Sequence, residues 1–142
     1  RVTYCLDLYD DFFADFQRDK ARDLIGFFGL PETLRLKQMS KGMREKVQIA
    51  LAMSRDASVF LLDEPISGVD PAARQVILDG LLRNLEPDSL LVIATHLVHD
   101  LEPLLDGVVM MRHGRVIAQG DADDLRAQHG ASLDQIFKET FR

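Results

Sequence analysis

The sequence lacks the features typical of membrane-spanning, disulfide-bonded or nucleic-acid-binding proteins. Cys5 is the only cysteine, so no disulfide can form within the chain, which fits a reducing compartment. The longest apolar runs, such as Leu90–Ala94, are far shorter than the roughly 20 residues that span a bilayer. Acidic residues outnumber basic ones by 23 to 17, and this net charge of −6 gives no basic field to attract DNA or RNA. These absences predict a protein that binds no nucleic acid and reaches a membrane only through a partner.

The length and composition suit one folded domain. A chain of 142 residues can bury a single core but is too short for two full domains. With 46% hydrophobic and 28% charged residues, the composition excludes a disordered or low-complexity chain. The sequence begins at Arg1, without an initiator methionine or an apolar signal region, so we expect it to be a piece of a longer protein.

The first third of the sequence has helical periodicity. Tyr9, Phe13 and Phe16 are spaced by three and four residues and alternate with aspartates, which predicts one helix with an aromatic face. This stripe is interpreted as core, with docking to a membrane partner as the alternative. Ser40 precedes a second predicted helix over residues 43–55, because serine is a favoured N-cap.

From residue 57 the pattern changes to short apolar runs that alternate with amphipathic segments. Residues 59–62 and 90–94 predict buried strands. The other predicted elements are a helix over 71–85, a short helix over 97–105, a hairpin over 108–118 and short helices from Leu125. This alternation predicts an α/β fold with a parallel sheet covered on both faces. We place the boundary between a helical part, 1–56, and an α/β part, 57–142, near Asp56.

Two acidic residues directly follow the first predicted strand. Asp63 and Glu64 lie just past its carboxyl end, where α/β sheets bind ligands. One carboxylate there can hold Mg²⁺, which prefers one or two carboxylate oxygens together with phosphate, and the next can orient or deprotonate an attacking water. The same residues also suit an exposed turn, so the neighbouring sequence must decide between the two interpretations.

The neighbouring motifs, taken in order, resemble the ATP-binding cassette (ABC) ATPases. The motifs are Ser40-Lys41-Gly42-Met43 at a helix start, Asp63-Glu64 after a strand, Ser67-Gly68-Val69-Asp70 before the next helix, and Thr95-His96 after the next strand. The resemblance extends from Tyr4 through the tail, including residues 114–120. It implies part of a P-loop NTPase (RecA-like) core with parallel strands and flanking helices, preceded by the helical subdomain of the ABC family.

The resemblance implies ATP and Mg²⁺ as ligands and a role for each motif. Asp63 would hold Mg²⁺ through water, Glu64 would be the catalytic base and His96 would contact the γ-phosphate. The residues facing a nucleotide held by a second subunit would be Ser40, Lys41, Gly42 and Asp70. Taken singly, Ser40 and Asp70 also suit helix N-caps, and His96 suits a loop histidine.

The sequence departs from the family pattern in two places. The usual signature is Leu-Ser-Gly-Gly-Gln, and here Met39, Lys41 and Met43 replace the leucine, the first glycine and the glutamine. No Gly-Lys dipeptide occurs, so the phosphate loop G-x-x-x-x-G-K-[ST] is absent, as are the Q-loop and the adenine-stacking aromatic. We therefore expect the 142-residue chain alone to bind MgATP weakly and to hydrolyse it negligibly.

The resemblance favours an ABC transporter ATPase at the cytoplasmic face of the membrane, paired with a second ATP-binding domain and with a transmembrane permease. One alternative is a segment of a DNA-repair or chromosome-maintenance ABC ATPase, but that would require a long heptad helix and fits poorly with the acidic balance. The other alternative is a truncated regulatory module without catalysis. The histidines without metal-ligand spacing are interpreted as surface residues, and Cys5 as an inert thiol.

Overall fold

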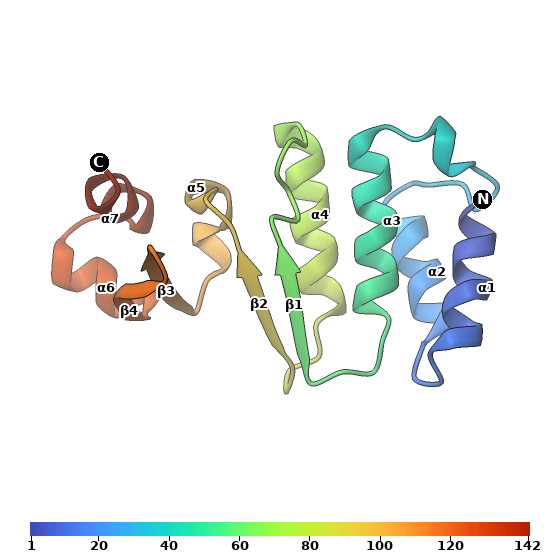
Figure 1. Ribbon diagram of the computed structural model, residues 1–142, viewed down its shortest axis with the longest axis horizontal. Coiled ribbons are helices and arrows are strands. Elements are labelled where there is room, and N and C mark those ends of the chain that lie inside the picture. The colour runs from blue at the N-terminus through green and yellow to red at the C-terminus, as the bar shows by residue number, and fades with distance from the viewer. The chain divides into compact units, whose positions relative to one another are not determined.

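The computed structural model describes residues 1–142, which form two compact units, Arg1–Thr95 and His96–Arg142 (Figure 1). The elements of the first unit are α1 (Val2–Phe12), α2 (Arg18–Phe27), the 3-10 helix η1 (Leu36–Gln38), α3 (Lys41–Met53), β1 (Val59–Asp63), α4 (Pro71–Asn84) and β2 (Leu90–Ala94). The elements of the second unit are α5 (Val98–Leu101), the 3-10 helix η2 (Glu102–Leu104), β3 (Gly107–Arg112), β4 (Arg115–Asp121), α6 (Ala122–His129) and α7 (Leu133–Thr140).

The aromatic segment near the N-terminus forms two helices, so the prediction of one helix is wrong. α1 ends at Phe12 because Phe13 has an extended backbone, with φ −123° and ψ 106°. Phe16 then forms an isolated antiparallel β-bridge with Arg55. The rings nevertheless cluster, since the centroid of Tyr9 lies 5.2 Å from that of Phe13 and 5.4 Å from that of Phe16. The spacing identified the aromatic cluster but not the turn that builds it.

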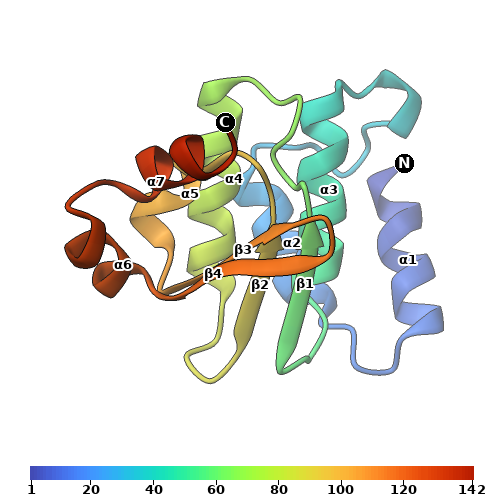
Figure 2. The same ribbon diagram turned by 60° about the vertical axis from the view of Figure 1, so that its left-hand side comes forward.

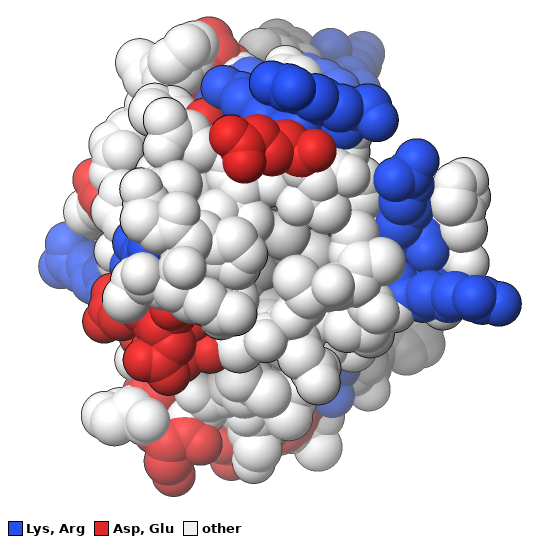
Figure 3. Space-filling view, turned by 90° about the vertical axis from the view of Figure 1, so that its left-hand side faces the viewer, with Lys and Arg blue, Asp and Glu red and all other residues white.

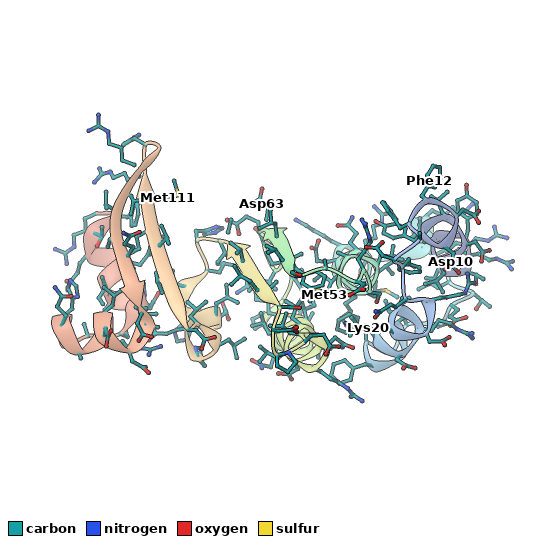
Figure 4. The ribbon with its side chains drawn as sticks, turned by 90° about the horizontal axis from the view of Figure 1, so that it is seen from below. Asp10, Phe12, Lys20, Met53, Asp63 and Met111 are labelled. Atoms are coloured by element: carbon teal, nitrogen blue, oxygen red, sulfur yellow. The ribbon has the colours of Figure 1, made fainter.

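The core of the first unit contains side chains from α1, α2, α3 and α4. Ser40 is the N-cap of α3, and its Oγ accepts a hydrogen bond from the backbone N–H of Met43 at 3.2 Å, as the sequence predicts. The large side chains that are almost completely buried include Leu24, Ile25, Ile49, Met53, Ile77 and Leu81. Met53 stands at the end of α3 (Figure 4).

β1 and β2 form a two-stranded parallel sheet, in register from Val59 opposite Leu90 to Asp63 opposite Ala94. The chain between these strands contains α4. Asp70 caps this helix by accepting a hydrogen bond from the N–H of Ala73 at 3.0 Å. A parallel pair joined through a helix confirms the predicted α/β class.

The prediction that both strands are buried is wrong for one face of this sheet. Leu61 is 75% exposed and its partner Val92 is 43% exposed, and Val59 and Leu90 on the same face are each more than half exposed. On the other face Phe60 is buried. Because successive side chains of a strand point to opposite faces, the sheet in this structure is covered on one face only.

The second unit contains the predicted hairpin and the C-terminal helices. β3 and β4 lie side by side in Figure 2, and their turn residues His113 and Gly114 both have positive φ angles, 50° and 75°, as in a type I′ turn. The predicted helix over 97–105 is divided into α5 and η2. The core residues of the unit are Met110, Ala122, Leu125, Leu133 and Ile136.

The surface of the second unit includes an area of uncharged side chains. The view in Figure 3 shows a broad uncharged area between Lys or Arg groups and Asp or Glu groups. The exposed apolar residues of the hairpin are Val109, Met111, Val116 and Ile117, each between 42% and 58% exposed. Neither unit contains a helix that is both long enough and apolar enough to cross a membrane.

Candidate functional site

Three of the motifs identified in the sequence lie at one end of the first unit. Figure 1 shows that α3 and α4 begin at the same end of the first unit and that the carboxyl end of β1 points toward this end. Residues 41–42 lie against residues 68–69, because Lys41 covers Gly68 and Gly42 faces Val69, and residues 63–64 precede this loop in the chain. The candidate site is built on this end.

Glu64 has an unusual backbone conformation. Its φ angle is 48°, in the left-handed region that residues with a side chain rarely adopt. The N–H of Glu64 donates a hydrogen bond to the carbonyl oxygen of Ala94 at 2.8 Å, so the pairing with β2 continues into the turn. A left-handed residue costs about 1–2 kcal/mol, and such outliers cluster at functional sites. Asp63, directly before it, is the last residue of β1 and is exposed.

The Glu64 carboxylate is held by the residue that directly follows the neighbouring strand β2. Thr95 Oγ1 donates a hydrogen bond to Glu64 Oε2 over 3.1 Å. Asp63 pairs with Ala94, so parallel register brings the next residue of each strand together. Sequence reasoning did not assign a role to Thr95. The register of the two strands is the signal that could have identified Thr95, because the residues that follow two paired strand ends must lie side by side.

The first turn of α3 lies against the loop that precedes α4. A Cβ atom on Gly42 would lie 3.6 Å from Val69 Cγ1 and 4.0 Å from Ala73 Cβ. A larger side chain at position 42 would push this loop away. Ser40, the N-cap of α3, is by contrast exposed, so a ligand or another chain can reach it.

The Lys41 side chain lies across Gly68. The Lys41 ammonium occupies the space that a Cβ on Gly68 would take, and Lys41 Cε lies 3.1 Å from that position. Gly68 also has a φ of 73°, so a glycine is required there on two grounds. Burial raises the pKa of the Glu45 carboxyl one turn along α3, and the Lys41 charge opposes this shift. Lys41 thus connects the turn at Ser40 to the loop before α4.

The remaining predicted residues have separate positions. Asp70 is exposed and uses Oδ1 to cap α4, so the helix-cap interpretation of this residue is confirmed. His96 is exposed and is the first residue of the second unit, directly after Thr95 in the chain. His129 forms a hydrogen bond through Nδ1 with the carbonyl oxygen of Leu125 at 3.0 Å.

Two hollows of the surface lie away from these motifs. One hollow of about 110 Å³ is lined by residues that include Lys20, Arg55, Ser58 and Glu86, at the end where β1 and β2 begin. The other is lined by Asp19, Arg22, Asp23 and Glu32. No group of three or more His, Cys, Asp or Glu side chains could hold a metal ion. Asp63 is exposed and Glu64 is half-buried at the carboxyl end of β1.

Comparison with known proteins places these motifs in a wider context. The family described as "AAA domain, putative AbiEii toxin, Type IV TA system" matches residues 19–99. YxlF, an uncharacterised ABC transporter ATP-binding protein of Bacillus subtilis, is 32% identical over 118 residues, or 82% of this chain and 40% of the relative. The methionine import ATP-binding protein MetN of Staphylococcus haemolyticus is 34% identical over 136 residues, or 87% of this chain and 40% of the relative.

A solved structure also has this fold. The ATP-binding subunit of an ABC transporter superposes with a TM-score of 0.73 and 30% identity, covering 87% of this chain and 54% of that one. The chain thus spans about 40% of the length of these two curated relatives and about half of the solved subunit. It aligns with the middle and C-terminal part of these proteins.

Proposed function

The chain belongs to the ABC transporter ATP-binding protein family, and on this basis we propose that it acts as the ATP-hydrolysing subunit of an ABC transporter. ATP hydrolysis would be coupled to movement of a transmembrane permease at the cytoplasmic face of the membrane. One observation carries the proposal: Asp63 and Glu64 follow one another at the carboxyl end of a parallel strand, and this strand points toward the end of the first unit where α3 and α4 begin. Within this proposal, residues 1–56 form the helical subdomain and 57–142 part of the ATPase core.

The two adjacent carboxylates have different proposed tasks. Asp63 provides one exposed carboxylate, which suits Mg²⁺ when phosphate oxygens supply further ligands. The ion, when bound, would neutralise phosphate charge. Glu64, oriented by Thr95, accepts a proton from the attacking water as that water approaches the γ-phosphate. The hydrogen bond from Thr95 restricts the carboxylate, so the base is positioned before substrate arrives.

A second ATP-binding subunit completes the proposed site. The exposure of Ser40 and the open surface at Asp63 support a site closed by another chain. Ser40, Lys41, Gly42 and Asp70 would face the nucleotide of that partner, and His96 would hydrogen-bond the γ-phosphate. The phosphate loop would come from residues outside the 142, because no Gly-Lys dipeptide occurs among them. We accordingly expect the 142-residue chain alone to be inactive.

The test is phosphate release from MgATP by the native protein expressed from its own gene. We expect Glu64→Gln to lower turnover by at least about 100-fold, while ATP binding, measured by equilibrium dialysis, stays within about twofold. Glu139→Gln is the matched control, because Glu139 is an exposed glutamate outside the site. Near-normal turnover in Glu64→Gln would remove Glu64 from the role of base and overturn the proposal.

A further inference from the structure

The loop that connects β1 to α4 is built from two overlapping turns, and the first of them begins at Glu64. The backbone N–H of Ser67 donates a hydrogen bond to the carbonyl oxygen of Glu64 at 3.3 Å, and the N–H of Val69 donates one to the carbonyl oxygen of Ile66 at 3.4 Å. Ile66 and Val69 are buried, with 0% and 4% exposure, so the loop is anchored in the core of the first unit. The backbone of Glu64 is thus connected to Val69 through these turns.

Arg74 holds the far end of this loop. Its Nε donates a hydrogen bond to the carbonyl oxygen of Val69 at 2.7 Å, and this contact is partly buried. The backbone N–H of Arg74 donates a second hydrogen bond, to the carbonyl oxygen of Asp70 at 2.9 Å. A buried carbonyl group without a donor is costly, and the burial of Val69 leaves its carbonyl oxygen little access to water. The Arg74 side chain therefore supplies a donor that the end of the loop needs.

The position of Arg74 in α4 is unfavourable for the helix itself. Asp70 is the N-cap and Pro71 the first residue of α4, so Arg74 lies about one turn from the N-terminal end. A positive charge there opposes the helix dipole, which favours acidic residues at this end, and the first turn of α4 contains none. The helix gains no stability from this charge, whereas the loop gains a hydrogen-bond donor.

We propose that Arg74 is a positioning residue for the Glu64 carboxylate. This inference rests on the proposed function, in which Glu64 is the base. The left-handed conformation of Glu64, with φ 48°, persists only where the surrounding structure holds it. Ala94 and Thr95 hold Glu64 from the side of β2, and Arg74 holds it from the side of α4 through the two turns of the loop. Without the Arg74 contact the loop gains freedom, and the carboxylate spends less time in the orientation that reaches the attacking water.

Two substitutions of Arg74 separate the Nε contact from the rest of the side chain. Glutamine places its amide nitrogen as many bonds from the backbone as arginine places Nε, so Arg74→Gln keeps the donor, whereas Arg74→Met has a similar length and no donor. In the native protein expressed from its own gene, we expect Arg74→Met to lower kcat for phosphate release about 10-fold, with KM for MgATP changed less than about twofold. Arg74→Gln should keep kcat within about threefold of the native value.

Arg83→Met is the matched control, because it removes a guanidinium group from the other end of the same helix. That group lies over the Phe27 ring, with Cζ 4.9 Å from the ring centroid, and does not contact the loop. We expect Arg83→Met to change kcat less than about twofold.

Amide hydrogen exchange of the same variants, followed by mass spectrometry, measures the loop without relying on activity. We expect residues 64–69 to exchange at least about fivefold faster in Arg74→Met than in the native protein, and at a native rate in Arg74→Gln. Exchange in α3 should be unchanged in both variants. This comparison separates positioning from a general loss of stability, because a generally destabilised first unit would exchange faster in α3 as well.

Four results would overturn the role of Arg74: near-normal kcat in Arg74→Met, an equal loss of kcat in Arg74→Gln, an equal loss of kcat in Arg83→Met, or unchanged exchange of residues 64–69 in Arg74→Met. Glu64→Gln, measured alongside, separates this inference from the proposed function. If Glu64→Gln is inactive and Arg74→Met is normal, only the role of Arg74 fails. If Glu64→Gln keeps near-normal turnover, the proposed function fails and the role of Arg74 fails with it.

Discussion

At the scale of single residues, two residues hold Glu64 in place: Ala94, the last residue of β2, and Thr95, which follows it. The backbone N–H of Glu64 donates a hydrogen bond to the carbonyl oxygen of Ala94, and its carboxylate accepts one from the Thr95 hydroxyl. The backbone contact holds a left-handed conformation, and the side-chain contact selects one orientation of the proposed base. These contacts explain how an exposed strand end can keep a carboxylate fixed without a closed pocket.

Thr95→Val tests the side-chain contact in the native protein. We expect about a 10-fold loss of kcat with little change in KM, because a hydrogen bond to a charged group contributes about 1.5–3 kcal/mol when its geometry matters for the reaction. Thr95→Ser keeps the hydroxyl and should retain turnover within about threefold. Phosphate release as a function of MgATP concentration separates the two parameters. Equal turnover in the valine and serine variants would show that the hydroxyl does not position Glu64.

Some residues of the site were predictable from the sequence, and others were not. Ser40 and Asp70 were identified as N-caps because capping depends on residues three positions apart. The contacts of Thr95 with Glu64 and of Lys41 with Gly68 join residues 31 and 27 positions apart. Such contacts depend on strand register and loop path, which composition and periodicity do not encode.

At the scale of helices, α2 and α4 approach each other at a glycine. A Cβ on Gly80 would lie 2.5 Å from Phe28 Cε1 and 3.2 Å from Leu24 Cδ1, so α4 can pack there only without a side chain. This close approach places α4 in the same compact unit as the N-terminal helices. The composition changes near residue 56, but the packing of the first unit continues across that position.

Gly80→Ala should lower the free energy of unfolding by about 1–3 kcal/mol, because the added methyl group overpacks the contact with Phe28. Gly26→Ala is the matched control in α2, where no side chain from another element lies within 4 Å of the position that the added methyl group would take. That substitution should raise stability by about 0.5–1 kcal/mol through helix propensity. Urea denaturation of the 142-residue chain measures both values. A change of the same sign and size in both variants would contradict the packing described for Gly80.

In the second unit, Glu102 joins η2 to the two C-terminal helices. Its carboxylate accepts hydrogen bonds from the N–H of Asp134 at 2.9 Å and from Arg126 Nε at 3.0 Å. Burial acts to raise the pKa of Glu102, but these hydrogen bonds and the Arg126 charge outweigh burial, so the pKa is lowered below its usual value of 4.5. The ionised form is therefore favoured in the folded state.

The lowered pKa of Glu102 predicts a pH-dependent contribution to stability. A carboxyl group with a depressed folded-state pKa stabilises the protein above its unfolded pKa, and this contribution disappears as the pH falls through the folded-state pKa. Glu102→Gln should therefore lower the melting temperature at about pH 7 by a few degrees and have less effect below about pH 4. Differential scanning calorimetry across this range measures the difference. An equal loss at neutral and at low pH would contradict the role given to the charge.

The element pattern was largely predictable, and the failures have physical causes. β1, β2, α3, α4 and the hairpin follow from apolar runs, capping residues and the His113-Gly114 turn. The prediction for the aromatic segment failed because a spacing of three and four residues between aromatic rings has two structural explanations. The rings can lie on one face of a continuous helix, or they can cluster where a helix ends and the chain turns. The strands were expected to be buried because an uninterrupted apolar run indicates a strand with both faces covered. In the structure, no other element of these 142 residues covers the face that carries Leu61 and Val92.

At the scale of the whole molecule, the first unit exposes an apolar sheet face and a polar end. The open face of β1 and β2 carries uncharged side chains, whereas the end with Asp63, Ser40 and Asp70 carries polar groups. We assign this polar end to a nucleotide enclosed between two subunits. In such a dimer, Ser40 would contact the nucleotide bound by the partner subunit, and Asp63 would hold Mg²⁺ at the nucleotide bound by its own subunit.

Mixing two inactive variants of the native protein tests this division most directly. Ser40→Arg should block the contact to the partner's nucleotide, and Asp63→Asn should weaken Mg²⁺ binding at the subunit's own nucleotide, so each variant alone should lose turnover. In a mixed dimer one site combines both defects and the other is intact. We therefore predict that an equimolar mixture, after subunit exchange, recovers roughly a quarter of wild-type phosphate release. A mixture that forms mixed dimers but stays as inactive as the separate variants would contradict this division, because Ser40 and Asp63 would then act on the same nucleotide within one subunit.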